Sequence, residues 1–286
     1  MADPTDNYQF SFNGWVFGGL GSGVQVLEVD GLEDMPQLRV QDDTRGYQDG
    51  MFTGRDFLGG RTITFTLQIM NDSANTMQEY LAQLKTNLLY QQAGTGVLQF
   101  QLPGRSVQRV GARVRKRALK VDPDYVYGRS TATVEMFCPD PRIYADASQG
   151  GVLTPGANVG RVYDRTYNLV YTTPLSGSSA FTSFANNGNV TVYPTFTITG
   201  PCNYPIIVNS TTGQSIPINY NLSASETLVI DPDLRAVTIN GSPARNVVSN
   251  TAQWFGLNPG STTIGIVVTT FTAPSQCVVA YRDGYV

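Results

Sequence analysis

The sequence predicts a mainly β protein of two domains, and three observations support this prediction. Short runs that alternate apolar and polar residues, or are rich in Val, Ile and Thr, recur along the 286 residues with turn residues between them. Only one long run has helical spacing. Charge is uneven, because residues 1–145 carry 30 charged side chains and residues 146–286 carry 11. We therefore expect one domain over 1–145 and a second over 146–286.

The first half is predicted to form a sheet with one flanking helix. Strands are expected at 8–12, 24–29, 62–70 and 97–102, and the run Thr62–Met70 alternates most cleanly. A helix is expected from about residue 75 to about residue 93, where Asn75 can cap and Gly94 can end it. Its apolar stripe, which should pack on the sheet, consists of Met77, Leu81, Leu84 and Leu88.

A closing strand at Thr131–Phe137 leads into a stiff exit from this domain. Pro139 and Pro141 follow it, and proline cannot donate to a β-ladder and favours extended geometry in the residue before it. The change in composition at the same place favours a domain boundary there.

The segment from Arg105 to Lys120 holds seven basic residues and no acidic one. Extended geometry places successive side chains on opposite faces. The sequence therefore predicts a strand with one arginine-bearing face and one apolar face. The expected basic face consists of Arg109, Arg113, Arg115 and Arg117, and the expected apolar face of Val110, Ala112, Val114 and Ala118.

Three interpretations of this strand remain open. It could bind nucleic acid, although the segment has no aromatic residue and its domain is net acidic. It could be a solvated edge strand guarded by charge. It could also form a subunit interface, in which the arginine face meets an acidic rim on the next copy of the chain. The candidate rim comprises Asp30, Glu33, Asp34, Asp42 and Asp43.

The second half is predicted to be a β-sandwich or jelly roll with little helix. We expect a connector at 145–160, a strand bearing Tyr163, Tyr167 and Tyr171, and a low-charge loop at 176–192. Further short strands are expected between Gly-, Pro- and Asn-containing turns. These strands are placed at 195–199, 206–209, 216–221, 227–230, 236–239, 263–270 and 276–281.

Several kinds of site are not expected. The chain lacks histidine, and its three cysteines, Cys138, Cys202 and Cys277, suit neither a disulfide framework nor a Cys/His zinc site. The acidic loops lack the order of a calcium-binding loop, and Gly19-Leu-Gly-Ser-Gly lacks the Lys-Ser/Thr of a phosphate loop. Asp231 and Asp233 flank Pro232 in a predicted turn. We therefore predict no enzyme, no metal and no cofactor.

Charge and hydropathy also limit the partners and the compartment. A net charge of −3 gives no general attraction to nucleic acid or to anionic membranes, so sequence-specific binding of nucleic acid is not expected. The chain has neither an apolar leader nor a run long enough for a membrane span, so no insertion into a membrane is expected. We expect the protein to be made in a cytoplasm-like compartment.

The order of motifs in the first half resembles the N-terminal domain of siphophage distal tail proteins. The matching pieces begin with Gly31-Leu32, Met35-Pro36 and Gly60-Arg-Thr-Ile-Thr-Phe, and end with Tyr127-Gly and Pro139-Asp-Pro-Arg-Ile-Tyr144. This resemblance implies a tail-tube-like β-sandwich with a helix, and a hexameric ring around a lumen that gives passage to DNA and the tape-measure protein.

The second half is similar to the galectin-like C-terminal domain of the same family. The similarity rests on Asn186-Asn-Gly, Ile198-Thr-Gly-Pro201, Leu228-Val-Ile-Asp231 and Leu257-Asn-Pro-Gly260. It implies a virion protein of the tail tip or baseplate, assembled in the host cytoplasm, whose ring joins the tail tube protein to the tip hub and tail-associated proteins. The alternative is a carbohydrate- or receptor-binding tail protein that acts through residues 146–286.

Overall fold

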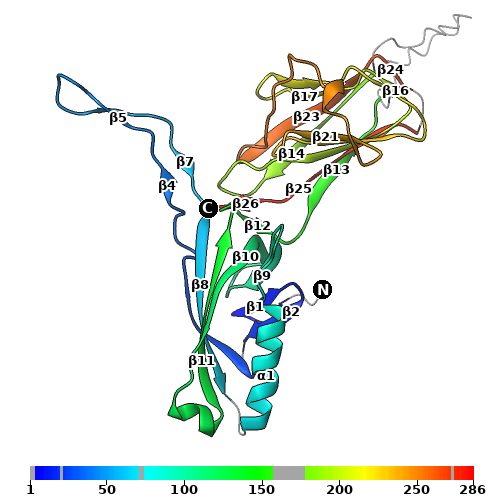
Figure 1. The fold of residues 1–286 in the computed structure, drawn as a ribbon. Helices are drawn as coiled ribbons and strands as arrows, with labels where there is room; N and C mark the ends of the chain where they lie inside the picture. The colour runs from blue at the N-terminus through cyan, green and yellow to red at the C-terminus, as the bar shows by residue number, and fades with distance from the viewer. Residues whose placement is uncertain (1–3, 20–21, 71–73, 157–177, 272–273) are drawn as a thin grey trace, which may run out of the picture. The chain divides into compact units, whose positions relative to one another are not determined.

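The computed structural model describes residues 4–19, 22–70, 74–156, 178–271 and 274–286. The chain divides into two compact units, of which the first comprises residues 1–146 with 285–286 and the second residues 147–284. Both are built mainly of β-strands (Figure 1), which confirms the predicted fold class.

The main sheet of the first unit has the strand order β2-β1-β9-β10-β11-β8-β3, with β12 paired to β10. All of these strand pairs are antiparallel. The strands are β1 Gln9–Phe12, β2 Trp15–Gly18, β3 Val24–Asp30, β8 Arg61–Met70, β9 Gly96–Gln101, β10 Gln108–Leu119, β11 Arg129–Cys138 and β12 Ile143–Ala145.

Strand β2 lies between the strands predicted at 8–12 and 24–29, where the sequence predicts no strand. Asn13 and Gly14 both have positive φ, at 51° and 89°, and join β1 to β2. This is the backbone geometry of the tight hairpin turn that Asn-Gly favours. The missed strand therefore had a sequence signal in the Asn-Gly pair.

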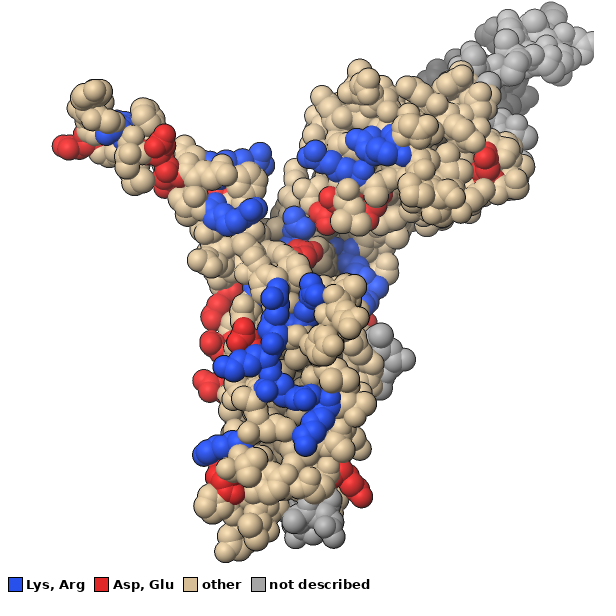
Figure 2. All heavy atoms as spheres, in the orientation of Figure 1, with Lys and Arg blue, Asp and Glu red and all other residues tan. Residues whose placement is uncertain are grey.

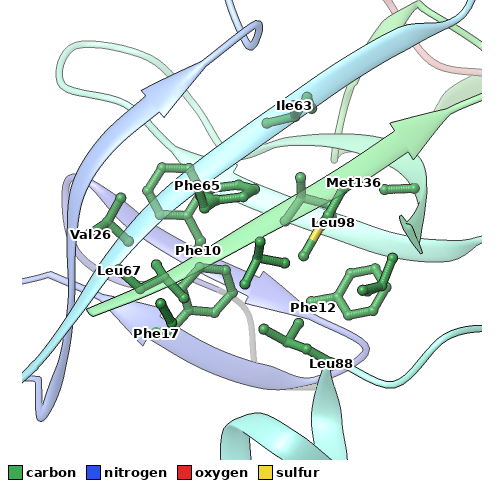
Figure 3. Packing of buried hydrophobic residues seen from close by; sticks show 14 of the residues in the cluster. Phe10, Phe12, Phe17, Val26, Ile63, Phe65, Leu67, Leu88, Leu98 and Met136 are labelled. Carbon is green, nitrogen blue, oxygen red and sulfur yellow. The ribbon is translucent and has the colours of Figure 1, made fainter. Parts of the chain in front are cut away.

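The core of the first unit is a cluster of aromatic and aliphatic side chains on the inner face of the sheet (Figure 3). Phe10 meets Phe65 edge-to-face at a ring-centroid distance of 5.2 Å, and Phe17 meets Phe65 at 5.6 Å. The alternation of Arg61–Met70 is realised, since Ile63, Phe65, Leu67 and Ile69 are all fully buried. Because β2 and β3 bring their own apolar residues to this cluster, both ends of the sheet share one core.

The helix α1, Ala74–Asn87, covers this core with its predicted apolar stripe. Met77, Leu81, Leu84 and Leu88 are all buried. The helix ends at Asn87, whereas the sequence predicts an end near residue 93. Asn75 is its second residue, and residues 71–73, which precede the helix, lie outside the described part of the chain.

A thin two-stranded arm, residues 37–59, leaves the sheet between β3 and β8 (Figure 1). It contains β4 Leu38–Arg39, β5 Asp43–Thr44, β6 Met51–Phe52 and β7 Phe57–Leu58, with β4 paired to β7 and β5 to β6. At Gly54 a Cβ atom would lie 1.8 Å from the carbonyl oxygen of Gln41, so only glycine fits between the strands. Every residue from 37 to 57 is exposed.

The turn between β10 and β11 is a 3₁₀-helix, η1, at Pro123–Tyr127. It lies at the end of the sheet opposite the arm. The start of β8, where the arm joins the sheet, pairs with the end of β11, since Arg61 faces Cys138. The start of β11, which follows η1, pairs with the end of β8, since Arg129 faces Met70.

The second unit contains a six-stranded sheet, β13-β25-β15-β20-β21-β22, and a four-stranded sheet, β14-β23-β17-β18, with a small third sheet of β19, β16 and β24. Their bounds are β13 Gln149–Leu153, β14 Ser178–Asn186, β15 Thr195–Thr199, β16 Cys202–Asn203, β17 Ile206–Asn209, β18 Gln214–Pro217, β19 Asn221–Leu222, β20 Thr227–Asp231, β21 Ala236–Ile239, β22 Ser242–Pro243, η2 Arg245–Val247, β23 Gly260–Val268, β24 Thr270–Phe271 and β25 Gln276–Tyr281, with β26 Gly284–Tyr285 at the end of the chain.

Most strands predicted for the second half are present, and two regions differ. The segment 176–192 was expected to be a loop, but β14 occupies residues 178–186 and pairs along its length with β23. The connector expected at 145–160 contains β13. The predicted strand that bears Tyr163, Tyr167 and Tyr171 lies outside the described residues.

Candidate oligomer interface

The predicted interface residues of the first unit are best understood from one part of its sheet. We call this part the strip, and it consists of β3, β8, β11 and residues 113–119 of β10. Strand β9 pairs with β10 only at residues 108–112, so residues 113–119 of β10 have a ladder partner on one side, β11. Among the described strands, β3 pairs with β8 alone. The two outer strands of the strip, residues 113–119 of β10 and β3, therefore each have one edge without a ladder partner among the described strands.

Rows of facing residues cross the strip and define its outer face, away from the core. In one row Lys116 faces Glu135, Glu135 faces Thr64, and Thr64 faces Asp30. The next row runs from Ala118 through Thr133 and Thr66 to Glu28. A basic residue thus stands at one end of the first row, and carboxylates stand at the β3 end of both.

The expectation that four arginines share one face of β10 is wrong at Arg117. The register between β10 and β11 shifts between Val114 and Lys116, which places a β-bulge at Arg115. A bulge inserts one extra residue and reverses the alternation beyond it. Arg117 therefore faces the same side as the buried Val134, and Ala118 lies on the outer face.

Arg117 serves the fold instead. Its Nη1 atom donates to the carbonyl oxygens of Lys85 and Leu88, at 2.8 and 3.1 Å. These carbonyls belong to the last turn and the end of α1, where helix carbonyls have no partner inside the helix and the helix dipole is negative. Arg117 is thus a C-terminal cap of α1, a contact that the sequence alone did not indicate.

Two further arginines of the predicted face are partly engaged within the chain. Arg109 lies 3.4 Å from a carboxylate oxygen of Asp146, and both side chains are one-quarter exposed. Arg113 donates from Nη2 to the carbonyl oxygen of Gln91 at 3.1 Å. These contacts leave less of both guanidinium groups available to a partner.

Arg115 and Lys116 are the most accessible basic residues of β10. Both are exposed, and the Arg115 guanidinium lies over the ring of Phe137 at 4.7 Å from its centroid. Figure 2 shows the basic side chains of the first unit gathered in a band, with acidic side chains along one border of that band. Lys116 was not among the predicted interface residues, because nothing in the sequence clearly indicates the bulge that places it on the outer face.

The acidic residues fall on three separate elements. Asp30 ends β3 and is exposed. Glu28, on the same strand, is also exposed and was not among the predicted rim residues. Glu33 and Asp34 lie in the loop that follows. Glu33 is already paired within the chain, because both of its carboxylate oxygens lie 2.9 Å from Nη1 of Arg105.

The loop that carries Glu33 and Asp34 is held by the buried Arg61. Its Nη1 atom donates to the carbonyl oxygens of Gly31, Leu32 and Asp34, and its Nε atom donates to Pro141. Burial lowers the pKa of the Arg61 guanidinium, an effect opposed by the nearby Cys138, Glu33 and Asp34. Arg61 thus fixes the acidic loop to the end of the sheet.

Asp42 and Asp43 lie on the arm. Asp42 Oδ1 accepts a hydrogen bond from the backbone N–H of Gly54 at 3.0 Å, and Asp43 Oδ1 accepts one from Thr44 at 2.9 Å. The Asp42 contact links the two arm strands between the β4–β7 and β5–β6 pairs. These carboxylates therefore have local roles in the arm.

A hollow of about 230 Å³ lies next to the β3 edge. Its lining includes the acidic Asp30, Glu33 and Asp34 and the apolar Leu32 and Leu102. A lining of apolar and carboxylate side chains suits a lysine or arginine side chain, which has an aliphatic stem and a charged head.

Other kinds of site receive no support from the part of the chain that the structure describes. No group of three or more Cys, Asp or Glu side chains there is arranged to hold a metal ion. Asp231 Oδ1 accepts hydrogen bonds from the backbone N–H groups of Asp233 and Leu234, at 3.0 and 3.1 Å, as expected for a turn residue. None of the described helices has the length and hydrophobicity needed to cross a bilayer.

Comparisons with known proteins agree with this architecture. Residues 187–285 match the family described as siphovirus-type tail component, C-terminal domain. The crystal structure of the Dit protein of SPP1, described as a paradigm of the hub adsorption apparatus in phages that infect Gram-positive bacteria, has a TM-score of 0.64. Its alignment covers 97% of this chain and 99% of that chain at 13% identity.

A second solved structure, the phage P2 baseplate in its activated conformation with Ca, has a TM-score of 0.52 to this chain. That alignment covers 95% of this chain and 97% of the other at 9% identity. At such low identities both likenesses concern the fold. No curated protein sequence matches the chain.

Residues 187–285 thus match a tail-component domain, and the chain as a whole shares its fold with proteins of a phage hub and a phage baseplate. Its resemblance to the siphophage distal tail proteins is confirmed, because residues 187–285 match a siphovirus-type tail component and the whole chain has the fold of the Dit protein.

Proposed function

We propose that copies of this chain join into a hexameric ring at the tip of a long phage tail, between the tail tube and the tip hub. The ring gives passage to DNA and the tape-measure protein. The observation that carries this proposal is the pair of unpartnered strand edges on the strip, one basic and one acidic. The chain has a structural role and no catalytic one.

The directions of the strands suit edge-to-edge joining. Successive strands across the strip are antiparallel, so β3 and β10 of one chain also run in opposite directions. Rotation about a ring axis keeps these directions. The β10 edge of one copy can therefore continue the antiparallel ladder at the β3 edge of the next, and repeated head-to-tail contacts of this kind close a ring.

Charge supports the same pairing. The exposed Glu28 and Asp30 of one copy would face the exposed Arg115 and Lys116 of the next. Opposite charges across an interface favour correct pairing and suppress wrong pairing. We thus revise the predicted contact. Glu28 and Lys116 join it, Arg117 leaves it, and Arg109 and Arg113 contribute less because each is partly engaged within its own chain.

The outer face of the strip would line the lumen of such a ring. Strand β8 presents Thr62, Thr64, Thr66 and Gln68 there, and β11 adds Thr131 and Thr133. On the same face the basic Arg115, Lys116 and Arg129 stand against the acidic Glu28, Asp30 and Glu135. A lining in which charges of both signs are mixed with neutral hydroxyl and amide groups holds a polyanion weakly, which suits passage better than tight binding.

The arm supplies a second proposed contact between copies. Met51 and Phe52 on the arm are 51% and 60% exposed, and an isolated two-stranded hairpin is at best marginally stable in water. A neighbouring copy that covers these side chains would stabilise the arm and the ring together.

The test is the mass and shape of the purified full chain. Light scattering at low ionic strength should give a single assembly of hexamer mass, and electron micrographs should show rings in axial view. Raising the salt should shift the assembly toward monomers, because salt screens exposed charge pairs. A chain that stays monomeric at high concentration, and is also monomeric within tails, would refute the ring.

A second candidate function has one observation in its favour. Phe181 on β14 is 46% exposed and lies across Gly265 of β23, where a Cβ atom would stand 2.2 Å from its ring. The residues around it on that face, Ser183, Thr263 and Val208, are uncharged. A neutral face with an exposed aromatic ring suits an uncharged ligand such as a sugar. Saturable binding on a glycan array that Phe181→Ala abolishes would favour this function over a purely structural one.

A further inference from the structure

The tip of the β10–β11 hairpin, residues 120–128, presents an exposed apolar surface. Val121, Val126 and Tyr127 are 77%, 76% and 77% exposed. Large apolar side chains that gather in the open often mark an interaction site. We call these three side chains the apolar tip.

The tip has a fixed shape. Pro123 begins η1, and Gly128 ends it in the left-handed region with φ 74°. Tyr125 anchors the turn to α1, since its hydroxyl oxygen accepts a hydrogen bond from Nε2 of Gln78 at 2.7 Å. The base of the hairpin is closed by the hydrogen bond from Lys120 N–H to the Thr131 carbonyl at 2.8 Å. The exposure therefore belongs to an ordered surface.

The place of the tip in the assembly depends on the proposed ring. If strip edges join copy to copy, the ends of the strands face the two rims of the ring. The arm leaves one end of the strip and the apolar tip lies at the other. Each rim would then carry a different element, and the tip would be repeated once per copy along one rim.

We propose that the apolar tip is the axial docking surface through which the ring binds a different ring-forming tail protein. Asp122 is paired with Lys120 at 3.2 Å, but Asp124 is exposed and, among the described residues, forms no ion pair. Two copies of this ring that met tip to tip would oppose identical tips, and neither tip offers the other's Asp124 a dedicated cation, because Lys120 is paired with Asp122 in its own chain. The fitting partner is a rim that offers apolar side chains and a basic residue.

The test uses the full chain in a phage that lacks its own copy of the gene. The variant Val126→Ser/Tyr127→Ser removes most of the tip, and its sites contribute nothing to the core. Leu234→Ser is the matched control, because Leu234 is 75% exposed in a turn of the second unit. Two quantities are measured for each protein: the mass of the purified assembly, and the amount of the protein found in complete tails.

The tip variant should keep the mass of the unaltered assembly while its incorporation into tails falls about tenfold or more, which corresponds to about 1.4 kcal/mol of lost docking free energy. The control should behave as the unaltered protein does. Normal incorporation of the tip variant would overturn the proposal. So would loss of the ring itself, or stacking of purified unaltered rings in pairs that the variant abolishes, because a second copy would then occupy the tip.

The outcomes also distinguish failure of the axial docking surface from failure of the proposed ring. An unaltered protein that forms no ring in solution or in tails refutes the proposed function. An intact ring whose tip variant enters tails normally refutes only the axial docking surface.

Discussion

Lys116 and Asp30 stand at the two ends of one row of facing residues that crosses β10, β11, β8 and β3. Within one copy, Glu135 and Thr64 separate them. When a second copy is placed beside the first at the same level, Lys116 of one comes next to Asp30 of the other. The same row thus brings opposite charges together at every joint of the proposed ring.

Removal of the Arg117 guanidinium should destabilise the packing of α1. Arg117→Ala leaves the carbonyls of Lys85 and Leu88 without this donor and removes a positive charge at the end of the helix. We expect the free energy of opening of α1 to fall by about 1–2 kcal/mol, as measured by hydrogen exchange of the α1 amides. Lys116→Ala, at an exposed site of the same strand, is the control and should change exchange little. Equal exchange in both variants would contradict the capping role.

Arg61→Ala should cost more, because its site is buried. The change leaves the carbonyls of Gly31, Leu32, Asp34 and Pro141 without their shared donor. We expect the free energy of unfolding of the first unit to fall by about 3 kcal/mol or more. Urea unfolding, followed by the NMR signals of backbone amides in this unit, measures the loss. Arg61→Lys should be intermediate, since an ammonium group lacks the planar fork of donors. A loss below about 0.5 kcal/mol for the alanine variant, the usual range for a surface change, would refute this role.

The three cysteines should be chemically inert in the native protein. Burial raises the pKa of the Cys138 thiol and of the Cys277 thiol to about 12, and it also raises the pKa of Cys202. Because the thiolate is the reactive form, a disulfide reagent at pH near 8 should react with them only after unfolding. Ser106→Cys, at an exposed site, should react at once and serves as the control. Fast reaction of the native unaltered protein would show that these sites open readily.

Shortening the arm should spare the fold and weaken the assembly. Replacing residues 40–56 with an Asn-Gly turn joins Arg39 to Phe57, which already face each other across β4 and β7. The removed residues are all exposed, so the unfolding temperature of the first unit should change little. The ring should dissociate at lower salt than the unaltered one. Rings of unchanged salt stability would contradict the proposed contact between the arm and a neighbouring copy.

Much of the fold could be predicted because local pattern and burial agree in it. The alternation of Arg61–Met70 and the stripe of α1 both point their apolar residues into the observed core. The strand β14 was missed because its Ser- and Ala-rich sequence lacks clear alternation, and its pairing with the distant β23 determines its structure. Tertiary context overrides weak local preference in such segments.

The candidate interface was only partly predictable, for a different reason. The sequence located the basic strand and the acidic residues, but the bulge at Arg115 decides which side chains are on which face. A bulge depends on the partner strand, so spacing alone gave Arg117 the wrong face and omitted Lys116. Contacts within the chain, such as that of Arg105 with Glu33, likewise depend on loops that the fold brings together.

The most direct test of the ring exchanges charge between its two edges. One variant, Glu28→Lys/Asp30→Lys, makes both edges of the strip basic, and the other, Arg115→Glu/Lys116→Glu, makes both acidic. Each variant alone should remain monomeric, because like charges meet at every joint. Arg129→Glu, on the same face but at the end of the interior strand β11, is the control and should leave assembly unchanged.

Native mass spectrometry of an equimolar mixture of the two variants gives the decisive result. Edge-to-edge closure predicts that mixing restores a hexamer-sized ring with equal numbers of the two variants, since every joint again brings opposite charges together. Normal rings from either variant alone, or a mixture in which both stay monomeric, would contradict the joining of β3 to β10.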